Sequence, residues 1–219
     1  MKVVVVGAGG FGREVLWLLR CVATPGNPLE ILGFVDDDKC LWGKDLCGAR
    51  VLAGLDFFGC AAGSGARAVC AVGNPRVKRD IVERLMQLGV SFQSAIHPAC
   101  QFSEFVKIGT AAIVAAGTVL TTQVEIGDFV TVNLNCTVGH DARLGSYTTL
   151  APGTHVSGDV KLGEGVDVGT GAVLLPGVTI GEWTTIGAGA VVTKDLPSHA
   201  VAVGVPARVI RKLQRSNDR

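Results

Sequence analysis

Apolar side chains recur at every sixth position through the second half of the chain. From Ile96 to Val192, each residue reached by steps of six is aliphatic or phenylalanine. A second register, two positions before each of these residues, holds only Val, Ala, Thr or Cys from Val106 to Ala190. An unbroken period of six is the hexapeptide signature of a parallel β-helix, in which three hexads make one coil of about 18 residues. The pattern therefore predicts an all-β domain over residues 96–219, a β-helix followed by a C-terminal tail.

The first half of the chain has a different hydrophobic pattern. Continuous apolar runs, typical of buried parallel strands, alternate with segments of helical spacing. Strands are expected at residues 3–6, 31–35, 68–72 and about 92–96, and helices after residue 12 and at 76–88. This alternation predicts an α/β Rossmann-like domain over residues 1–95. Because a full dinucleotide domain has two βαβαβ halves, so short a unit is expected to take a mononucleotide-sized ligand rather than NAD.

A glycine-rich turn joins the first expected strand to the first helix. The segment "GAGGFG", residues 7–12, fits G-x-G-x-x-G, and the second strand ends in Asp36, Asp37 and Asp38. Glycines let a backbone approach a phosphate, and an acid after the second strand can accept hydrogen bonds from a ligand. The pattern favours a nucleotide site. A turn that only packs the helix on the strand, followed by a solvated acidic loop, would give the same residues.

Composition and charge exclude several classes of function. A net charge of +1 gives no electrostatic reason to expect nucleic acid or an anionic membrane surface as a partner. No signal peptide precedes the first strand, and no apolar run is long enough for insertion into a membrane. The seven cysteines include no CxxC pair, which favours reduced thiols in a cytoplasmic protein over disulfides or a metal site.

His140 and Asp141 stand side by side in the repeat. They lie between Val138 and Ala142, one residue of each inward register, so both side chains should face outward at an edge of a coil. In a cleft, the imidazole could act as a general base, with the carboxylate fixing its tautomer. The same two residues could equally form an exposed polar corner. The other histidines are not spaced as a set of ligands, so no metal is expected.

Six segments together resemble one family over nearly the full length of the chain. They are "VVVVGAGGFGREV", "FVDDD", "AVGNPRVKRDI", "TVGHDARLG", "LAPGTHVSGDVKLG" and "VGVPARVI". The combination is similar to the bacterial nucleotide-sugar N-acetyltransferases with an N-terminal Rossmann-like domain, which stand alongside sialic acid O-acetyltransferase-like proteins. The resemblance implies a left-handed parallel β-helix, a homotrimer, and acetyl-CoA as the co-substrate.

The resemblance also implies roles for individual residues. His140 matches the catalytic base of the family, and Asp141 matches its partner carboxylate, which is more often Glu in the family. The nucleotide-sugar positions are Gly9, Gly10, Phe11, Asp36, Asp37, Gly73 and Arg76. The acetyl-CoA positions are Thr149, Gly158, Thr170 and Ala188. Thr149 departs from the family, which often has a histidine there, although a hydroxyl can still donate a hydrogen bond to the acetyl carbonyl.

These observations predict an acetyl-CoA-dependent N-acetyltransferase that acts on a nucleotide-linked amino sugar of the 4-amino-4,6-dideoxy type, in bacterial glycan biosynthesis. His140 would be the base in a direct attack of the amine on the thioester. Two alternatives stay open: an O-acetyltransferase of sialic acid or another sugar, and a non-catalytic scaffold that binds nucleotide sugars. The sequence leaves open whether the nucleotide is UDP, GDP or dTDP.

Overall fold

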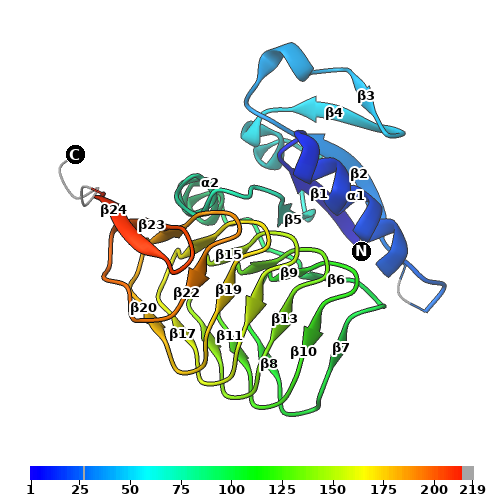
Figure 1. Ribbon diagram of the computed structural model, residues 1–219. Helices are drawn as coiled ribbons and strands as arrows, with labels where there is room; N and C mark the ends of the chain where they lie inside the picture. Colours follow the sequence, from blue (N-terminus) through cyan, green and yellow to red (C-terminus); the bar gives the residue numbers. More distant parts are fainter. Residues whose placement is uncertain (27, 214–219) are drawn as a thin grey trace. The chain divides into compact units, whose positions relative to one another are not determined.

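The computed structural model describes residues 1–26 and 28–213 of the 219-residue chain. The chain divides into two compact units, Met1–Pro98 and Ala99–Arg219. Figure 1 draws the first unit in blue to teal and the second in green to red. The first alternates strands and helices, whereas the second consists of short strands joined by turns. The boundary expected from the sequence lies between residues 95 and 96.

The first unit is built on a five-stranded sheet of order β3-β4-β2-β1-β5. All neighbouring strands are parallel except β3 and β4, which form a hairpin. The strands are β1 (Lys2–Val6), β2 (Glu30–Val35), β3 (Asp45–Leu46), β4 (Ala49–Ala53) and β5 (Arg67–Cys70). The other elements are the helices α1 (Gly10–Val22) and α2 (Pro75–Gln87), the 3-10 turns η1 (Lys39–Leu41) and η2 (Leu55–Gly59), and the short strand β6 (Ala95–Ile96).

Buried aliphatic side chains hold this unit together. β1 lies between β2 and β5, and its valines, residues 3–6, are at most 1% exposed. α1 buries Val15, Leu16 and Leu19 on one face, at the spacing of an amphipathic helix. The strands expected at residues 3–6, 31–35 and 68–72 and both expected helices are present, with ends shifted by a few residues. The strand expected at about 92–96 does not join this sheet as a full strand, since Phe92 makes an isolated bridge with Ala68 and only Ala95–Ile96 is a strand. No helix in the described part of the chain is both long enough and apolar enough to cross a membrane.

The β3–β4 hairpin has no counterpart among the expected elements. Its turn residues Cys47 and Gly48 both have positive φ, 56° and 73°, as a tight two-residue hairpin turn needs. Cysteine is not a usual residue at such a position, so the turn leaves no recognisable mark in the sequence. β4 then extends the parallel sheet beyond β2, where Phe34 pairs with Val51.

The second unit is a parallel β-helix whose strands form three sheets. Residues one coil apart lie side by side, as Val119 and Thr137 do, so each coil uses three hexads. The first sheet contains β7 (Gln101–Phe102), β10 (Val119–Leu120), β13 (Thr137–Val138), β16 (His155–Val156), β19 (Val173–Leu174) and β22 (Val191–Val192). The second contains β8 (Lys107–Ile108), β11 (Glu125–Ile126), β14 (Arg143–Leu144), β17 (Lys161–Leu162) and β20 (Thr179–Ile180). The third contains β9 (Ile113–Val114), β12 (Thr131–Val132), β15 (Thr149–Leu150), β18 (Asp167–Val168), β21 (Thr185–Ile186) and β23 (Ala200–Val203). β24 (Arg208–Lys212) extends this sheet beyond the coils and pairs antiparallel with β23.

The two inward registers form the core of the β-helix. The aliphatic register is buried at every position from Val114 to Val192, and the small register from Ala112 to Ala190. The first coil departs from this rule, since Phe102 belongs to the aliphatic register yet is 50% exposed. Its strand β7 is the last strand of its sheet and, among the described strands, pairs with β10 alone. A core position at the end of a stack lacks the coil that would cover it.

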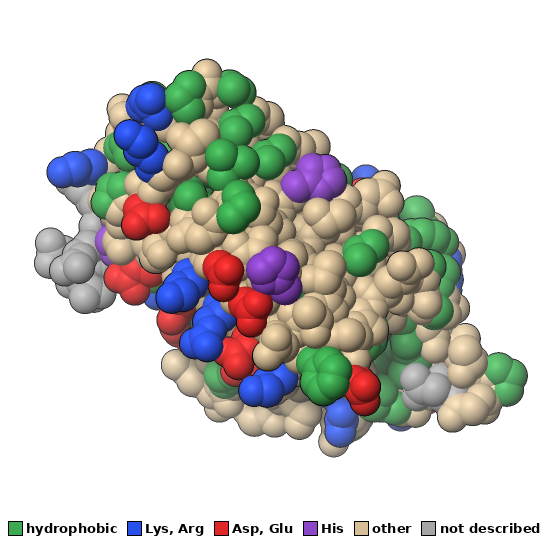
Figure 2. Space-filling model, turned by 60° about the horizontal axis from the view of Figure 1, so that its bottom comes forward, with side chains coloured by type: hydrophobic (Ala, Val, Ile, Leu, Met, Phe, Trp, Pro, Cys, Tyr) green, Lys and Arg blue, Asp and Glu red, His purple; other side chains and the backbone are tan. Residues whose placement is uncertain are grey.

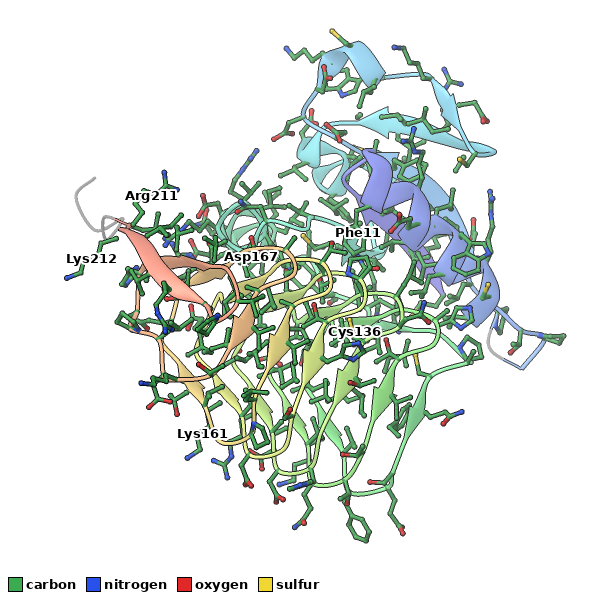
Figure 3. All side chains as sticks on the ribbon, in the orientation of Figure 1. Phe11, Cys136, Lys161, Asp167, Arg211 and Lys212 are labelled. Atoms are coloured by element: carbon green, nitrogen blue, oxygen red, sulfur yellow. The ribbon has the colours of Figure 1, made fainter. Side chains whose placement is uncertain are left out.

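Charged side chains cover the outside of the second sheet. Oε1 of Glu125 lies 3.3 Å from Nζ of Lys107, and Oε2 of Glu125 lies 3.6 Å from Nε of Arg143. Lys161, one coil beyond Arg143, points outward from β17 (Figure 3). Figure 2 shows basic and acidic side chains interleaved on one face of the molecule. The outward positions of the repeat are therefore free to carry polar chemistry without disturbing the core.

Candidate active site

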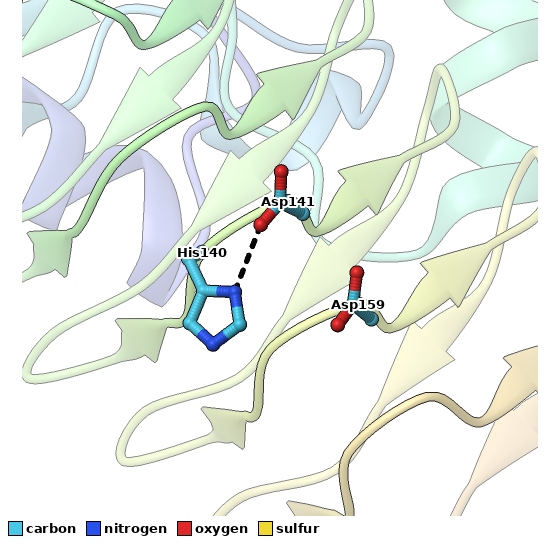
Figure 4. A group of neighbouring side chains, drawn as sticks. All are labelled: His140, Asp141 and Asp159. Atoms are coloured by element: carbon cyan, nitrogen blue, oxygen red, sulfur yellow. Dashed lines mark hydrogen bonds and ion pairs between the residues drawn. The ribbon is translucent and has the colours of Figure 1, made fainter.

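His140 and Asp141 lie in the turn after β13. Both side chains face outward, as the repeat predicts, and are 59% and 45% exposed. Nδ1 of the imidazole lies 2.9 Å from Oδ2 of Asp141, and Figure 4 shows the ring and the carboxylate turned toward each other. Asp141 has a left-handed backbone, with φ of 60°, which aspartate tolerates better than most residues. The turn therefore holds the two neighbouring side chains in contact.

This hydrogen bond decides which ring nitrogen of His140 can accept a proton. An ionised carboxylate only accepts hydrogen bonds, so Nδ1 must carry the hydrogen. Nε2 is then left with a lone pair. A neutral imidazole held in this way is suited to general-base catalysis, because the carboxylate stabilises the imidazolium that forms when Nε2 takes a proton.

Gly158, one coil further along, lies against the imidazole ring. A Cβ atom at this position would stand 2.5 Å from both Cε1 and Nε2 of His140. The backbone reinforces the contact, since the N–H of Asp159 donates to the carbonyl oxygen of His140 at 2.9 Å. Only glycine leaves room for the ring as it lies here, so Gly158 helps to set the position of Nε2.

Asp159 brings a second carboxylate to the pair. It occupies the place that Asp141 has in the preceding coil, and its φ of 59° is nearly the same. His140, Asp141 and Asp159 each offer a donor atom within 4.8 Å of the other two (Figure 4). An imidazole and two exposed carboxylates so close together attract cations, whether a divalent metal ion or an ammonium group. The sequence analysis did not single out Asp159, and the signal that marks it is its separation of one coil from Asp141.

The glycine turn of the first unit combines a packing role with an open backbone. A Cβ on Gly12 would collide with the carbonyl oxygen of Gly7, so this glycine lets α1 approach the end of β1. Gly9 has no atom within 4 Å of the place where a Cβ would stand, and Gly10 has only the tip of Arg13 at 3.9 Å. The backbone at these two positions is open in front of α1, where a helix N-terminus favours an anion.

The predicted acids after β2 are tied to the protein itself. Asp36 accepts hydrogen bonds from the N–H of Ala8 at 2.8 Å and of Asp38 at 2.9 Å, so it holds the glycine turn in place. Asp37 accepts a hydrogen bond from Arg84 at 3.0 Å and is 56% exposed. Each carboxylate oxygen has more than one acceptor site, so both residues can still bind a ribose or a base.

The remaining predicted nucleotide-sugar residues lie at helix beginnings. Phe11 is in the first turn of α1 and is labelled in Figure 3. Gly73 precedes the N-cap of α2, Asn74, whose Oδ1 accepts a hydrogen bond from the N–H of Arg76 at 3.0 Å. Partial burial and the nearby Arg79 lower the pKa of the Arg76 guanidinium, which stays charged at neutral pH.

The predicted acetyl-CoA positions do not lie together within one chain. The turns between the three sheets form three edges of the β-helix. Gly158 is on the edge of His140, between the first and second sheets, whereas Thr170 and Ala188 are on the edge between the third and first sheets. Thr149 lies on the third sheet and is only 7% exposed. The predicted acetyl-CoA positions are therefore divided between two edges and one sheet of the β-helix.

The histidines outside the pair have other surroundings, and none of them lies in the His140 cluster among the described residues. The ring of His97 packs against Trp17 with the two planes tilted by 34°. Nδ1 of His155 lies 2.9 Å from Oγ1 of Thr137, and Nε2 of His199 lies 3.5 Å from Oε1 of Glu182. The described residues therefore give one candidate centre for proton transfer, at His140.

Known proteins match the chain over nearly its full length. Residues 2–85 match the PglD N-terminal domain, and residues 159–194 match the bacterial transferase hexapeptide (six repeats). PerB from Caulobacter crescentus, solved in complex with CoA and GDP-perosamine, is 33% identical, with a TM-score of 0.86 over 96% of this chain and 98% of that chain. The acetyltransferase domain of PglB from Neisseria gonorrhoeae, solved in complex with acetyl coenzyme A, is also 33% identical, with a TM-score of 0.86 over 95% and 98%. The chain belongs to the hexapeptide-repeat family of nucleotide-sugar N-acetyltransferases.

Membership of this N-acetyltransferase family confirms the resemblance seen in the sequence. It also confirms the predicted fold class, an α/β Rossmann-like domain followed by a left-handed parallel β-helix. A curated relative, the GDP-perosamine N-acetyltransferase of Escherichia coli O157:H7, is 32% identical over 138 residues. This match spans 63% of the chain and 61% of that enzyme.

Proposed function

We propose that this N-acetyltransferase transfers the acetyl group of acetyl-CoA to the amine of a nucleotide-linked amino sugar, with His140 as the general base. The observation that carries the proposal is the outward-facing pair of His140 and Asp141, joined at 2.9 Å so that Nε2 is left as the proton acceptor. The pair lies in a chain that matches PerB, solved with CoA and GDP-perosamine, over 96% of its length.

The proposed reaction needs no covalent intermediate with the enzyme. The amine nitrogen attacks the thioester carbonyl carbon, and Nε2 of His140 takes the proton that the nitrogen loses. Collapse of the tetrahedral intermediate breaks the C–S bond, and the imidazolium returns the proton to the sulfur of CoA. Cys136, which precedes β13, does not compete as a nucleophile, because burial raises the pKa of its thiol to about 11 and keeps it protonated.

The two substrates would be bound by different units of the chain. In the first unit, Gly9, Gly10 and Phe11 would meet the nucleotide sugar at the open helix N-terminus, and Asp36, Asp37, Gly73 and Arg76 would complete its site. On the β-helix, Thr149, Gly158, Thr170 and Ala188 would contact acetyl-CoA. The open backbone of Gly9 and Gly10 supports the first assignment, and the exposure of Thr170 and Ala188 supports the second. No step of this reaction calls for a metal.

We further propose a homotrimer with acetyl-CoA bound between neighbouring chains. The support is the placement of Gly158 on one edge and of Thr170 and Ala188 on another. In a closed cyclic assembly the two edges of different subunits can face each other, and one ligand can then contact both. The cytoplasmic location and the role in glycan biosynthesis stay predictions.

Acetylation of a panel of sugars tests the proposed function. The purified protein is incubated with acetyl-CoA and UDP-, GDP- or dTDP-linked 4-amino-4,6-dideoxy sugars, and with the counterparts in which a hydroxyl replaces the amine. We expect release of the CoA thiol and an N-acetyl product with an amino sugar. Turnover of hydroxyl acceptors alone would establish the O-acetyltransferase alternative. Thermal stabilisation by nucleotide sugars, with no response to acetyl-CoA, would establish the scaffold.

Mixing two inactive variants tests the intersubunit site. His140→Ala removes the base on one edge, and Ala188→Trp should block acetyl-CoA on the other edge. When the two variants are unfolded and refolded together at equal amounts, about one quarter of the interfaces should combine two intact edges and restore that fraction of the wild-type activity.

The control for this experiment mixes His140→Ala with the double variant His140→Ala/Ala188→Trp. Every chain then lacks the imidazole, so no activity should return. If the first mixture also stays inactive although both variants sediment as trimers, the acetyl-CoA site is not shared between chains. Sedimentation of the wild-type protein as a 22.6 kDa monomer at micromolar concentration would contradict the trimer itself.

A further inference from the structure

We propose that Asp159 binds the acceptor amine and gives the site its preference for nitrogen over oxygen. The inference rests on the proposed function and adds a specificity residue to it. Asp159 lies in the turn after β16, next to Gly158, the residue against which the imidazole of His140 lies. Its carboxylate offers an oxygen within 4.8 Å of a ring nitrogen of His140 and of an oxygen of Asp141.

The carboxylate of Asp159 has no partner of its own among residues 1–26 and 28–213. Asp141 differs, because its Oδ2 is bound to Nδ1 of His140. The basic residue Arg143, on the following strand β14, lies 3.6 Å from Glu125. Lys161, two residues after Asp159, forms no ion pair within the described part of the chain and points outward from β17 (Figure 3). The site therefore presents one uncompensated carboxylate beside the base.

The backbone of the turn fixes the edge of the β-helix on which Asp159 lies. Asp159 has a φ of 59°, and its N–H donates to the carbonyl oxygen of His140, which ties the two coils at this edge. The corresponding position of the next coil is Gly177, which has no side chain to fill the space beyond Asp159. The backbone thus carries Asp159 on the same edge as the imidazole, and its exposed carboxylate stays open to a ligand.

An amine and a hydroxyl place different demands on such a pair. An attacking amine has two N–H bonds, so it can donate one to Nε2 of His140 and the other to Asp159 while its lone pair attacks the thioester. A hydroxyl has a single O–H. If it donates to Nε2, its remaining lone pairs face the carboxylate of Asp159 and are repelled. One nitrogen with hydrogen bonds near 2.9 Å can bridge acceptors up to about 5 Å apart. Asp159 offers an oxygen within 4.8 Å of a ring nitrogen of His140, so the two side chains are close enough to share one amine.

The charge on Asp159 is tested by Asp159→Asn. Asparagine also tolerates a left-handed backbone, so the turn should keep its shape while the negative charge is lost. Loss of a charge-assisted hydrogen bond should lower kcat/KM for GDP-perosamine, or for the amino sugar that the wild type prefers, by about 10- to 100-fold. The KM for acetyl-CoA should stay within about twofold, and kcat/KM for the hydroxyl counterpart should not fall.

Glu164→Gln is the matched control. Glu164 is an exposed carboxylate of the next turn, on the edge between the second and third sheets, so this variant removes an equal charge away from His140. It should leave both acceptors unaffected. Where turnover of the hydroxyl counterpart is too slow to follow, its Kd and that of the amino sugar are compared by calorimetry with CoA present.

An unchanged ratio of amine to hydroxyl acceptors in Asp159→Asn would overturn the inference. Equal losses with both acceptors would also overturn it, since Asp159 would then act only by supporting the position of His140. Failure of the proposed function would instead appear in the assay of the wild-type protein, which would then acetylate none of the amino sugars.

Discussion

A His140→Ala variant should lose about 10²- to 10⁴-fold in kcat, the usual contribution of a positioned proton acceptor. The loss should appear in kcat, measured by release of the CoA thiol with a saturating amino sugar. The KM for acetyl-CoA should change little, because the imidazole serves the acceptor amine. Full activity of the variant would show that the pair is only an exposed polar corner of the β-helix.

The partner carboxylate provides the internal control for this prediction. Asp141→Asn should cost less than His140→Ala, because it disturbs the tautomer and basicity of the ring but leaves the ring in place. The double variant should be scarcely worse than His140→Ala, since Asp141 acts only through the histidine. Additive losses would instead give Asp141 a direct contact with the acceptor.

A Gly158→Ala variant should lose about 10²-fold in kcat, although it adds only one methyl group. The new Cβ would stand 2.5 Å from Cε1 and Nε2 of His140, so the ring must turn away from its present position. A displacement of about 1 Å at a reacting atom is enough for a loss of this size. Gly158 does not have a left-handed backbone, so alanine fits its conformation and the melting temperature should change little.

Two further variants separate this effect from a general disturbance. Gly59→Ala places a methyl group where no atom lies within 4 Å, also without a left-handed backbone, and should leave kcat unchanged. The double variant Gly158→Ala/His140→Ala should be no worse than His140→Ala, because Gly158 acts on catalysis through the ring. If Gly158→Ala raises only the KM for acetyl-CoA, the glycine serves the co-substrate and does not position the base.

The β-helix could be predicted from the sequence because each coil places the same kinds of side chain at the same inward positions. Every hexad must place one aliphatic and one small side chain in the core, so the period records the fold directly. Phe102 is the exception, since it fits the period but is 50% exposed in the first coil of the stack. The hexapeptide period is the same in the first coil as in the others, so it does not predict that an inward position there is exposed. The β3–β4 hairpin escaped prediction for a local reason, the unusual Cys47 in its turn.

The candidate site could be predicted only as far as its residues are neighbours in the sequence. His140 and Asp141 are adjacent, and the repeat shows that both point outward. Asp159 comes from the next coil, and its approach to the pair depends on which turns are stacked on one edge. The same is true of Gly158, whose contact with the ring appears only when the coils are laid side by side. For the glycine turn, both interpretations of the sequence hold, because Gly12 packs the helix while Gly9 and Gly10 stay open.

Deleting one hexad and deleting a whole coil of three hexads have the same effect on the core of the β-helix but different effects on the active site. Removing one hexad beyond the first coil would leave both inward registers intact, since the hexads there bury the same kinds of side chain. It would nevertheless rotate everything beyond the deletion by a third of a turn. A deletion between His140 and Gly158 would carry Gly158 and Asp159 to another edge and separate them from the imidazole. Only insertions or deletions of a whole coil, the spacing that pairs Val119 with Thr137, keep each edge aligned. The active site therefore requires that the chain length between its residues change only by whole coils, whereas core packing alone would also tolerate changes of a single hexad.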